Sequence, residues 1–154
     1  MGLIFWILLS YVLWIYIHEY AHLLALKRFV QVKSHAIKPY PHNHPELGFV
    51  FASVSCDYDQ ELTDRQFAWV SFAPRIPDAL VLPLALFIPC SSLWWLVILT
   101  GGVVDLIRGS MTGRETADVR RYSEGFKMPL RAVLACQYVY ALCCLLAIAG
   151  RVYG

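Results

Sequence analysis

The segment His18-Glu19-Tyr20-Ala21-His22 has the residue types and the spacing of a metal site. On a helix, residues four positions apart share one face, so His18 and His22 can present ring nitrogens to a single ion. Glu19 lies beside them and can take a proton from water without binding the ion. The pattern therefore predicts one zinc ion (Zn2+) per chain, with His18 and His22 as ligands and Glu19 as the catalytic base.

The motif lies within a long apolar block of an unusually apolar chain. Of the 154 residues, 58% are hydrophobic and 16% are charged, whereas soluble domains are about half apolar and about a quarter charged. A helix needs about 20 apolar residues to cross a bilayer core of about 30 Å. Blocks of this kind occupy residues 2–26, 66–88, 92–107 and 130–149. We expect an all-α membrane protein, a bundle of about four transmembrane helices that forms a single membrane-embedded domain over residues 1–154.

The membrane setting strengthens the case for a metal. Ionisable side chains at the bilayer centre cost a few kcal/mol each when they are unpaired, and a bound cation offsets that cost. Two alternatives stay open at this point. The polar residues could be hydrogen-bonded within a helix bundle, or the motif could lie at the headgroup level, since His22 is only about 7 Å of helix rise from Lys27.

The charges of the loops predict the orientation of the chain. Basic residues gather between the first and second blocks and between the third and fourth, whereas residues 89–91 carry no charge. By the positive-inside rule, both long loops and the metal site face the cytoplasm, and both termini lie on the opposite side. No basic segment precedes the first block and no small-x-small site follows it, so we expect a membrane span there and not a cleaved signal peptide.

A tetrahedral zinc site with an open position needs a third protein ligand. Besides Glu19, the carboxylates within the apolar blocks are Asp78 and Asp105. Asp105 is three residues before Arg108, which gives it nearly the depth of His22, whereas Asp78 lies roughly 18 Å into its span. We therefore predict that Asp105 is the third ligand. The preceding Gly101-Gly102 favours close approach of another backbone or of a substrate, or serves helix packing alone.

Arg75 and Asp78 are three residues apart in a segment with two prolines, Pro74 and Pro77. We interpret them as a structural ion pair at a broken helix. The alternative is that Arg75 lines a water path to the metal. The remaining histidines are interpreted as surface residues, with a regulatory or displaceable ligand as the alternative; they are His35, His42 and His44.

The connections between the apolar blocks carry weaker signals. Alternating residues over about 30–59, as at 48–55, separated by turn-forming residues over 39–45, predict a small cytoplasmic β-hairpin between the first and second spans. Thr63 or Asp64 is the expected N-cap of the next helix, and residues 109–128 are expected to form a loop. The five cysteines have no CxxC spacing and indicate neither disulfides nor redox chemistry. With a net charge of only +2, nucleic acid is not an expected partner.

Together these motifs resemble those of the site-2-protease-like intramembrane zinc metallopeptidases, and among them the short bacterial and archaeal zincin peptidases. The resemblance covers most of the chain. It rests on the metal motif at 18–22, on 62–66 followed by Ala73-Pro74, on Gly101-Gly102 with Asp105, and on Asp118 with Gly125-Phe126. It implies an integral protein of a prokaryotic plasma membrane with a zinc site near the cytoplasmic side.

The expected function is zinc-dependent hydrolysis of peptide bonds in or near transmembrane segments. The partners of such an enzyme are the lipid bilayer and a membrane-protein or peptide substrate. Two alternatives belong to other classes: a non-catalytic membrane zinc-binding protein with a regulatory or assembly role, and a subunit of a metal transporter.

Overall fold

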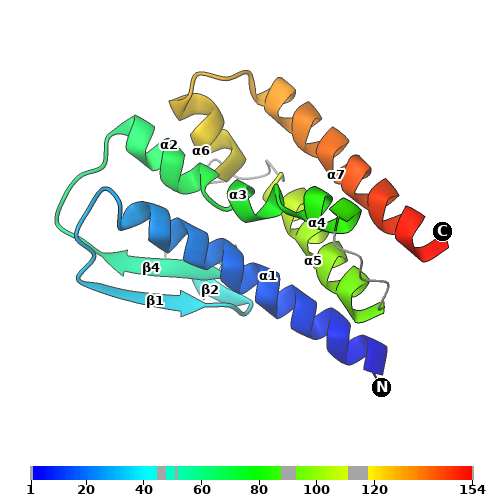
Figure 1. Cartoon of the computed structure of the whole chain (residues 1–154). Coiled ribbons are helices and arrows are strands. Elements are labelled where there is room, and N and C mark those ends of the chain that lie inside the picture. The colour runs from blue at the N-terminus through cyan, green and yellow to red at the C-terminus, as the bar shows by residue number, and fades with distance from the viewer. Residues whose placement is uncertain (1, 45–47, 51, 88–92, 111–117, 154) are drawn as a thin grey trace.

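A computed structural model describes residues 2–44, 48–50, 52–87, 93–110 and 118–153, and its helices account for most of them (Figure 1). The elements in chain order are α1 (Gly2–Leu26), β1 (Ser34–Lys38), β2 (His42–His44), β3 (Gly48–Val50), β4 (Ser53–Asp57), α2 (Asp64–Phe72), α3 (Arg75–Asp78), α4 (Val81–Phe87), α5 (Leu93–Gly109), α6 (Asp118–Gly125) and α7 (Leu130–Tyr153). The uncharged turn at 89–91 and the loop residue Arg114 lie outside the described residues.

Within the described part of the chain, three helical stretches are long and apolar enough to cross a membrane: Ile4–Leu26, Asp64–Phe87 and Leu130–Arg151. They correspond to the first, second and fourth of the apolar blocks. The third block forms α5, whose 17 residues span about 26 Å, slightly less than the bilayer core. The structure thus supports a membrane protein, while a bundle of four spanning helices stays a prediction.

The second stretch is broken at its prolines. Thr63 caps α2 through a reciprocal pair of hydrogen bonds, in which its hydroxyl accepts from the backbone N–H of Gln66 and its own N–H donates to Gln66 Oε1. Pro74 and Pro77 lack the N–H that a continuous helix requires, so α2 gives way to the short α3 and then to α4. The change of direction brings Arg75 and Asp78 into the interior, where both are buried.

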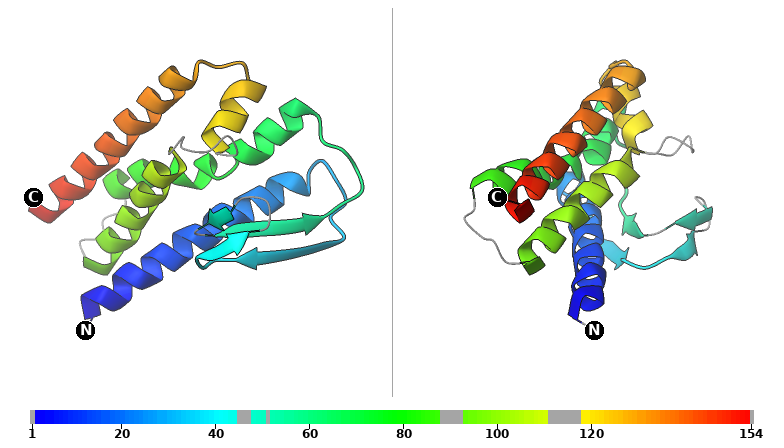
Figure 2. Two further views of the ribbon diagram at one scale, coloured as in Figure 1. Left: turned by 180° about the vertical axis from the view of Figure 1, so that it is seen from behind. Right: turned by 90° about the vertical axis from the view of Figure 1, so that its right-hand side faces the viewer.

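Helix α1 packs along α5, and α5 in turn packs against α7 (Figures 1 and 2). The α1–α5 contact is close: Trp14 Nε1 donates to the carbonyl of Ile98 at 2.6 Å, and Ser10 Oγ donates to that of Val97 at 3.1 Å. Both termini lie at one end of the molecule, and α2, α6 and the strands lie toward the other. The side of a membrane on which the termini lie stays a prediction.

The strands described between α1 and α2 form two antiparallel pairs in the region where a single short hairpin is expected. Among the described strands, β1 pairs with β4 in antiparallel register from Ser34 opposite Asp57 to Lys38 opposite Ser53, and β2 pairs with β3. The layer runs alongside the C-terminal half of α1 and contacts it through β1 and β4 (Figure 2).

The loop expected over residues 109–128 is wrong in part, because the structure has helix α6 there. Most of this helix is polar, but Val119 and Tyr122 are fully buried against α2 at a three-residue spacing. Gly125 permits the close approach, since a Cβ there would lie 2.5 Å from that of Ala68. A single short apolar stripe among charges left little sequence signal for a helix.

The α1–α5 contact predicts a cost for side chains at Gly101. A Cβ at this position would lie 2.0 Å from Ser10 Oγ and 2.7 Å from Trp14 Cδ1, which forces the helices apart or the tryptophan out of place. We expect Gly101→Ala to lower the free energy of unfolding in detergent micelles by about 1–3 kcal/mol. Gly150→Ala on α7 is the control, because a Cβ there has no described neighbour within 4 Å. Equal stability of the two variants would contradict the close contact.

Candidate metal centre

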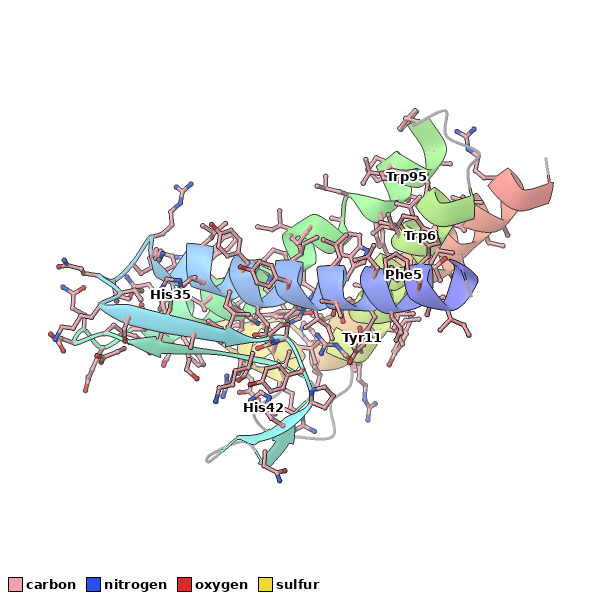
Figure 3. The ribbon with its side chains drawn as sticks, turned by 90° about the horizontal axis from the view of Figure 1, so that it is seen from below. Phe5, Trp6, Tyr11, His35, His42 and Trp95 are labelled. Carbon is pink, nitrogen blue, oxygen red and sulfur yellow. The ribbon has the colours of Figure 1, made fainter. Side chains whose placement is uncertain are left out.

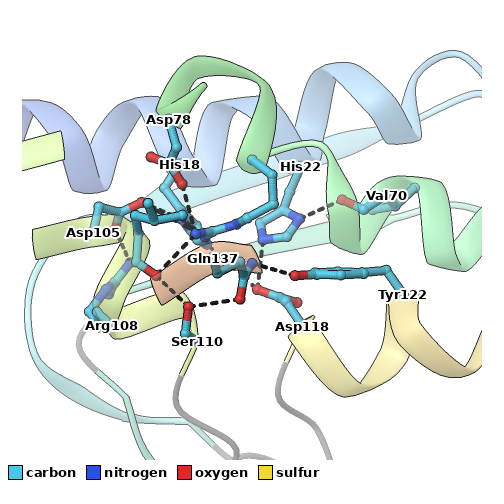
Figure 4. Close-up of polar contacts among 12 residues, drawn as sticks. His18, His22, Val70, Asp78, Asp105, Arg108, Ser110, Asp118, Tyr122 and Gln137 are labelled. Atoms are coloured by element: carbon cyan, nitrogen blue, oxygen red, sulfur yellow. Dashed lines mark hydrogen bonds and ion pairs between the residues drawn. The ribbon is translucent and has the colours of Figure 1, made fainter. Parts of the chain in front are cut away.

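The two histidines of the motif lie on one face of α1 and point into the space between α1, α5 and the start of α6 (Figure 4). His18 is buried and His22 is partly buried, and their ring centroids are 5.0 Å apart. The four-residue spacing on an unbroken helix produces this arrangement, as predicted.

One nitrogen of each ring is already engaged. His18 Nδ1 lies 2.8 Å from Asp105 Oδ2, and His22 Nδ1 lies 2.8 Å from the carbonyl oxygen of Val70. A carbonyl can only accept, and an ionised carboxylate likewise, so both Nδ1 atoms act as the N–H donors. Each ring is therefore fixed in orientation, and Nε2 is the ring atom that can bind a metal once it carries no proton.

The two Nε2 atoms converge on a third group, the carboxylate of Asp118 at the start of α6. Asp118 Oδ2 lies 3.2 Å from His22 Nε2 and 3.5 Å from His18 Nε2. One ligand atom from each of the three residues lies within 4.8 Å of the others. Two imidazole nitrogens and a carboxylate oxygen are a donor set found in open three-ligand zinc sites. The described residues thus form a group that could hold a metal ion.

The electrostatics of Asp118 favour the ligand form. Burial opposes ionisation, but the neighbouring His22 and His18 outweigh it and hold the pKa of Asp118 well below its usual range. A metal ligand must be deprotonated, and this carboxylate needs no further proton loss to bind.

Asp105, the predicted third ligand, lies next to the motif but on its other side. Its Oδ2 meets His18 at Nδ1, and its Oδ1 accepts a hydrogen bond from Arg108 Nη2 at 2.8 Å. Arg75 Nη2 is 4.0 Å away. The depth estimate placed Asp105 level with His22, whereas in the structure it meets His18, about one helical turn earlier on α1. In this position the carboxylate orients the ring and leaves Nε2 to face Asp118.

Sequence reasoning from the apolar blocks could not find Asp118, because it lies in a polar segment outside every block. The only signal was its place in the family resemblance. The predicted ion pair of Arg75 and Asp78 is present, with Arg75 Nη1 2.7 Å from Asp78 Oδ2.

A cleft of about 650 Å³ opens beside the three-residue group, and Glu19 lies in its wall together with His22 and Asp118. Glu19 is 6% exposed, so its carboxyl group is held near the histidines and largely out of bulk water. Another part of the wall is the consecutive run 52–56, which covers most of β4. Because neighbouring strand residues point to opposite faces, a run of this kind shows that the edge of β4 borders the cleft.

The three loop histidines do not share one environment. His42 lines the cleft, where its Nε2 lies 2.9 Å from Ser53 Oγ and its Nδ1 lies 2.8 Å from the carbonyl oxygen of Tyr40. His35 is exposed on β1, at a separate place on the strand layer (Figure 3). The side chain of His44 lies outside the described part of the chain.

Metal affinity should distinguish the two carboxylates. We expect Asp105→Asn to weaken binding of zinc or cobalt by about 10- to 100-fold, as for partners that orient a ligand, and Asp118→Asn to weaken it further. Isothermal titration of the purified, metal-stripped protein measures both affinities. Glu124→Gln is the matched control, since Glu124 is an exposed carboxyl group on the same helix as Asp118. A larger loss for Asp105→Asn would instead support Asp105 as the third ligand.

Comparison with known proteins adds no assignment to this geometry: no protein-family model, no curated protein and no solved structure matches the chain. The resemblance to site-2-protease-like peptidases therefore stays an expectation from the motifs quoted for it. Any functional assignment must be argued from the arrangement of the side chains.

Proposed function

We propose that this chain is an intramembrane zinc metalloprotease that hydrolyses peptide bonds in or near transmembrane segments of membrane proteins. The observation that carries the proposal is the convergence of His18 Nε2, His22 Nε2 and the Asp118 carboxylate, with both Nδ1 atoms already anchored. Rings fixed in this way are organised for a metal before it binds. A purely structural site needs only its metal ligands. Here the adjoining cleft wall also holds Glu19, which can act as a base.

In this proposal His18, His22 and Asp118 hold the zinc ion, and Asp105 fixes the orientation of His18. The zinc ion, when bound, supplies Lewis acidity toward water and toward a carbonyl oxygen. Glu19 accepts the proton of the attacking water and returns it to the leaving amine. Its low exposure keeps that proton from exchanging freely with solvent. His42, which lines the same cleft, is placed to contact a bound peptide.

The substrate is proposed to bind as an extended strand along β4. A transmembrane helix hides its carbonyls in its own hydrogen bonds, so a segment must unwind before cleavage. In the described part of the sheet, β4 pairs on one edge with β1, and its other edge borders the cleft. An unwound segment could add to that edge through main-chain hydrogen bonds, which places its backbone beside Glu19 and His22.

We further propose that the metal centre faces the cytoplasm of a prokaryotic cell and that both termini face away from it. Basic residues support this orientation, since Lys27 and Arg28 follow α1 at the end opposite the termini. Arg120 and Arg121 lie on α6, near the same end.

Replacing Glu19 tests the catalytic role. We expect Glu19→Gln to retain about one zinc per chain, because three other residues hold the ion, and to lose cleavage, because the amide cannot accept the proton. Zinc content is measured by elemental analysis of the purified protein. Cleavage is measured by comparing the membrane proteomes of cells with the wild-type and the variant chain, in which uncut substrates should accumulate.

Glu61→Gln is the matched control, since Glu61 is exposed and is not among the cleft residues. Its proteome should equal that of the wild-type chain. A Glu19→Gln proteome identical to the wild type, alongside a changed one for His18→Ala, would replace the protease by a non-catalytic zinc-binding regulatory or assembly protein. Zinc flux into liposomes that contain the pure chain would instead indicate a transporter.

A further inference from the structure

A second cavity lies apart from the cleft, and its walls come from α2, α3, α5, α6 and α7. Its volume is about 430 Å³. Most of its wall is apolar and includes Phe72, Leu106 and Val133. Arg75 and Asp78 of α3 also line it, so the mainly apolar cavity has one charged part of its wall, which we call the charged floor. No residue of the candidate metal group is among its lining residues.

The charged floor is incompletely satisfied by the protein. Arg75 is 6% exposed and Asp78 is 1% exposed. Their ion pair uses Arg75 Nη1 and Asp78 Oδ2, whereas Arg75 Nε and Asp78 Oδ1 find no hydrogen-bond partner among the residues that the structure describes. A buried polar atom left without a partner costs about 1–3 kcal/mol, and more when it is charged. The arrangement therefore calls for a ligand that supplies these bonds.

The free atoms define the chemistry of that ligand. It must accept a hydrogen bond from the N–H of Arg75 and donate one to the carboxylate of Asp78, and it must be neutral because the pair is neutral as a whole. Water meets these conditions, and two to four polar partners are enough to hold it. The cavity is much larger than the roughly 30 Å³ that one water molecule occupies in the liquid. Met128, in the connection between α6 and α7, lines the cavity and is 39% exposed, so the cavity opens at the surface beside the charged Lys127, where this connection is expected to meet water.

We propose that this cavity is a water-filled site within the membrane domain that solvates the Arg75–Asp78 pair. The solvated arginine is the link to the metal centre, since Arg75 Nη2 lies 3.4 Å from His18 Nδ1 and 4.0 Å from Asp105 Oδ2. Water on one side of the guanidinium offsets part of the cost of burying it, while the Asp105 carboxylate lies on the other side. The water site does not depend on whether the metal centre is catalytic.

The chain carries a thiol that reports on this cavity. Cys136 of α7 lines it and is exposed, whereas the neighbouring Ala135 is also exposed but is not a lining residue. The two positions differ in depth by about 1.5 Å of helix rise. A membrane-impermeant, trimethylammonium-bearing methanethiosulfonate reacts with thiolates, which form in water and not in lipid. Labelling in lipid nanodiscs thus compares water access at one depth on two faces of α7.

The first experiment uses a chain in which every cysteine except Cys136 is replaced by alanine. The comparison chain carries Cys136→Ala and Ala135→Cys in the same background. We expect Cys136 to be labelled about tenfold faster or more, because only its thiol ionises in water. Equal rates would overturn the proposal. So would a co-purified lipid that blocks labelling of Cys136 until it is extracted, since the occupant would then be lipid.

A second variant tests whether the charged floor is what attracts water. The double substitution Arg75→Met with Asp78→Leu keeps the approximate volume and removes the polar atoms, a change that buried ion pairs often tolerate. We expect the labelling rate of Cys136 to fall to that of the Ala135→Cys comparison. An unchanged fast rate in a folded double variant would show that access does not depend on Arg75 and Asp78, and would overturn the proposal.

Discussion

The hydrogen bond between His18 Nδ1 and Asp105 Oδ2, 2.8 Å long and almost fully buried, constrains much of this structure. Charged groups within apolar helices are costly unless other groups satisfy them. Here Arg108 binds Asp105 from the same helix, α5, and Arg75 approaches from α3 with Asp78 beside it. Each charge is compensated by another, and the imidazole of His18 is thereby fixed in one orientation.

A bond of this length requires α1 and α5 to approach closely, and the residues where the two helices touch allow that approach. Gly101 and Gly102 present no side chain to α1, and Trp14 occupies the space that their Cβ atoms would need. Trp14 and Ser10 also donate hydrogen bonds to carbonyls of α5. The glycine pair, which could have been explained by substrate access, is accounted for here by helix packing. The same contact therefore packs α1 against α5 and sets the distance between His18 and Asp105.

The break in the second spanning stretch explains how distant parts of the chain reach the site. Prolines divide it into α2, α3 and α4. Arg75 on α3 is therefore turned into the interior, whereas α2 packs against α6. Ala68 of α2 packs with Val119 and Tyr122 of α6 in a small apolar cluster. That cluster fixes the start of α6, which carries Asp118 to the two histidines. His22, held by the carbonyl of Val70 on α2, completes the connection.

The sequence by itself determined the features that depend on local periodicity and on solvation: the apolar helices, the shared face of His18 and His22, a cap at Thr63 or Asp64 and the pairing of Arg75 with Asp78. Depth estimated from residue number placed Asp105 near the motif, at the level of His22, although the structure pairs it with His18. Only the tertiary structure decided that Asp118 faces both Nε2 atoms, that His42 enters the cleft and that β4 offers an edge to it. These contacts join residues far apart in the chain, and their geometry follows from how the helices and strands pack, which no local pattern encodes.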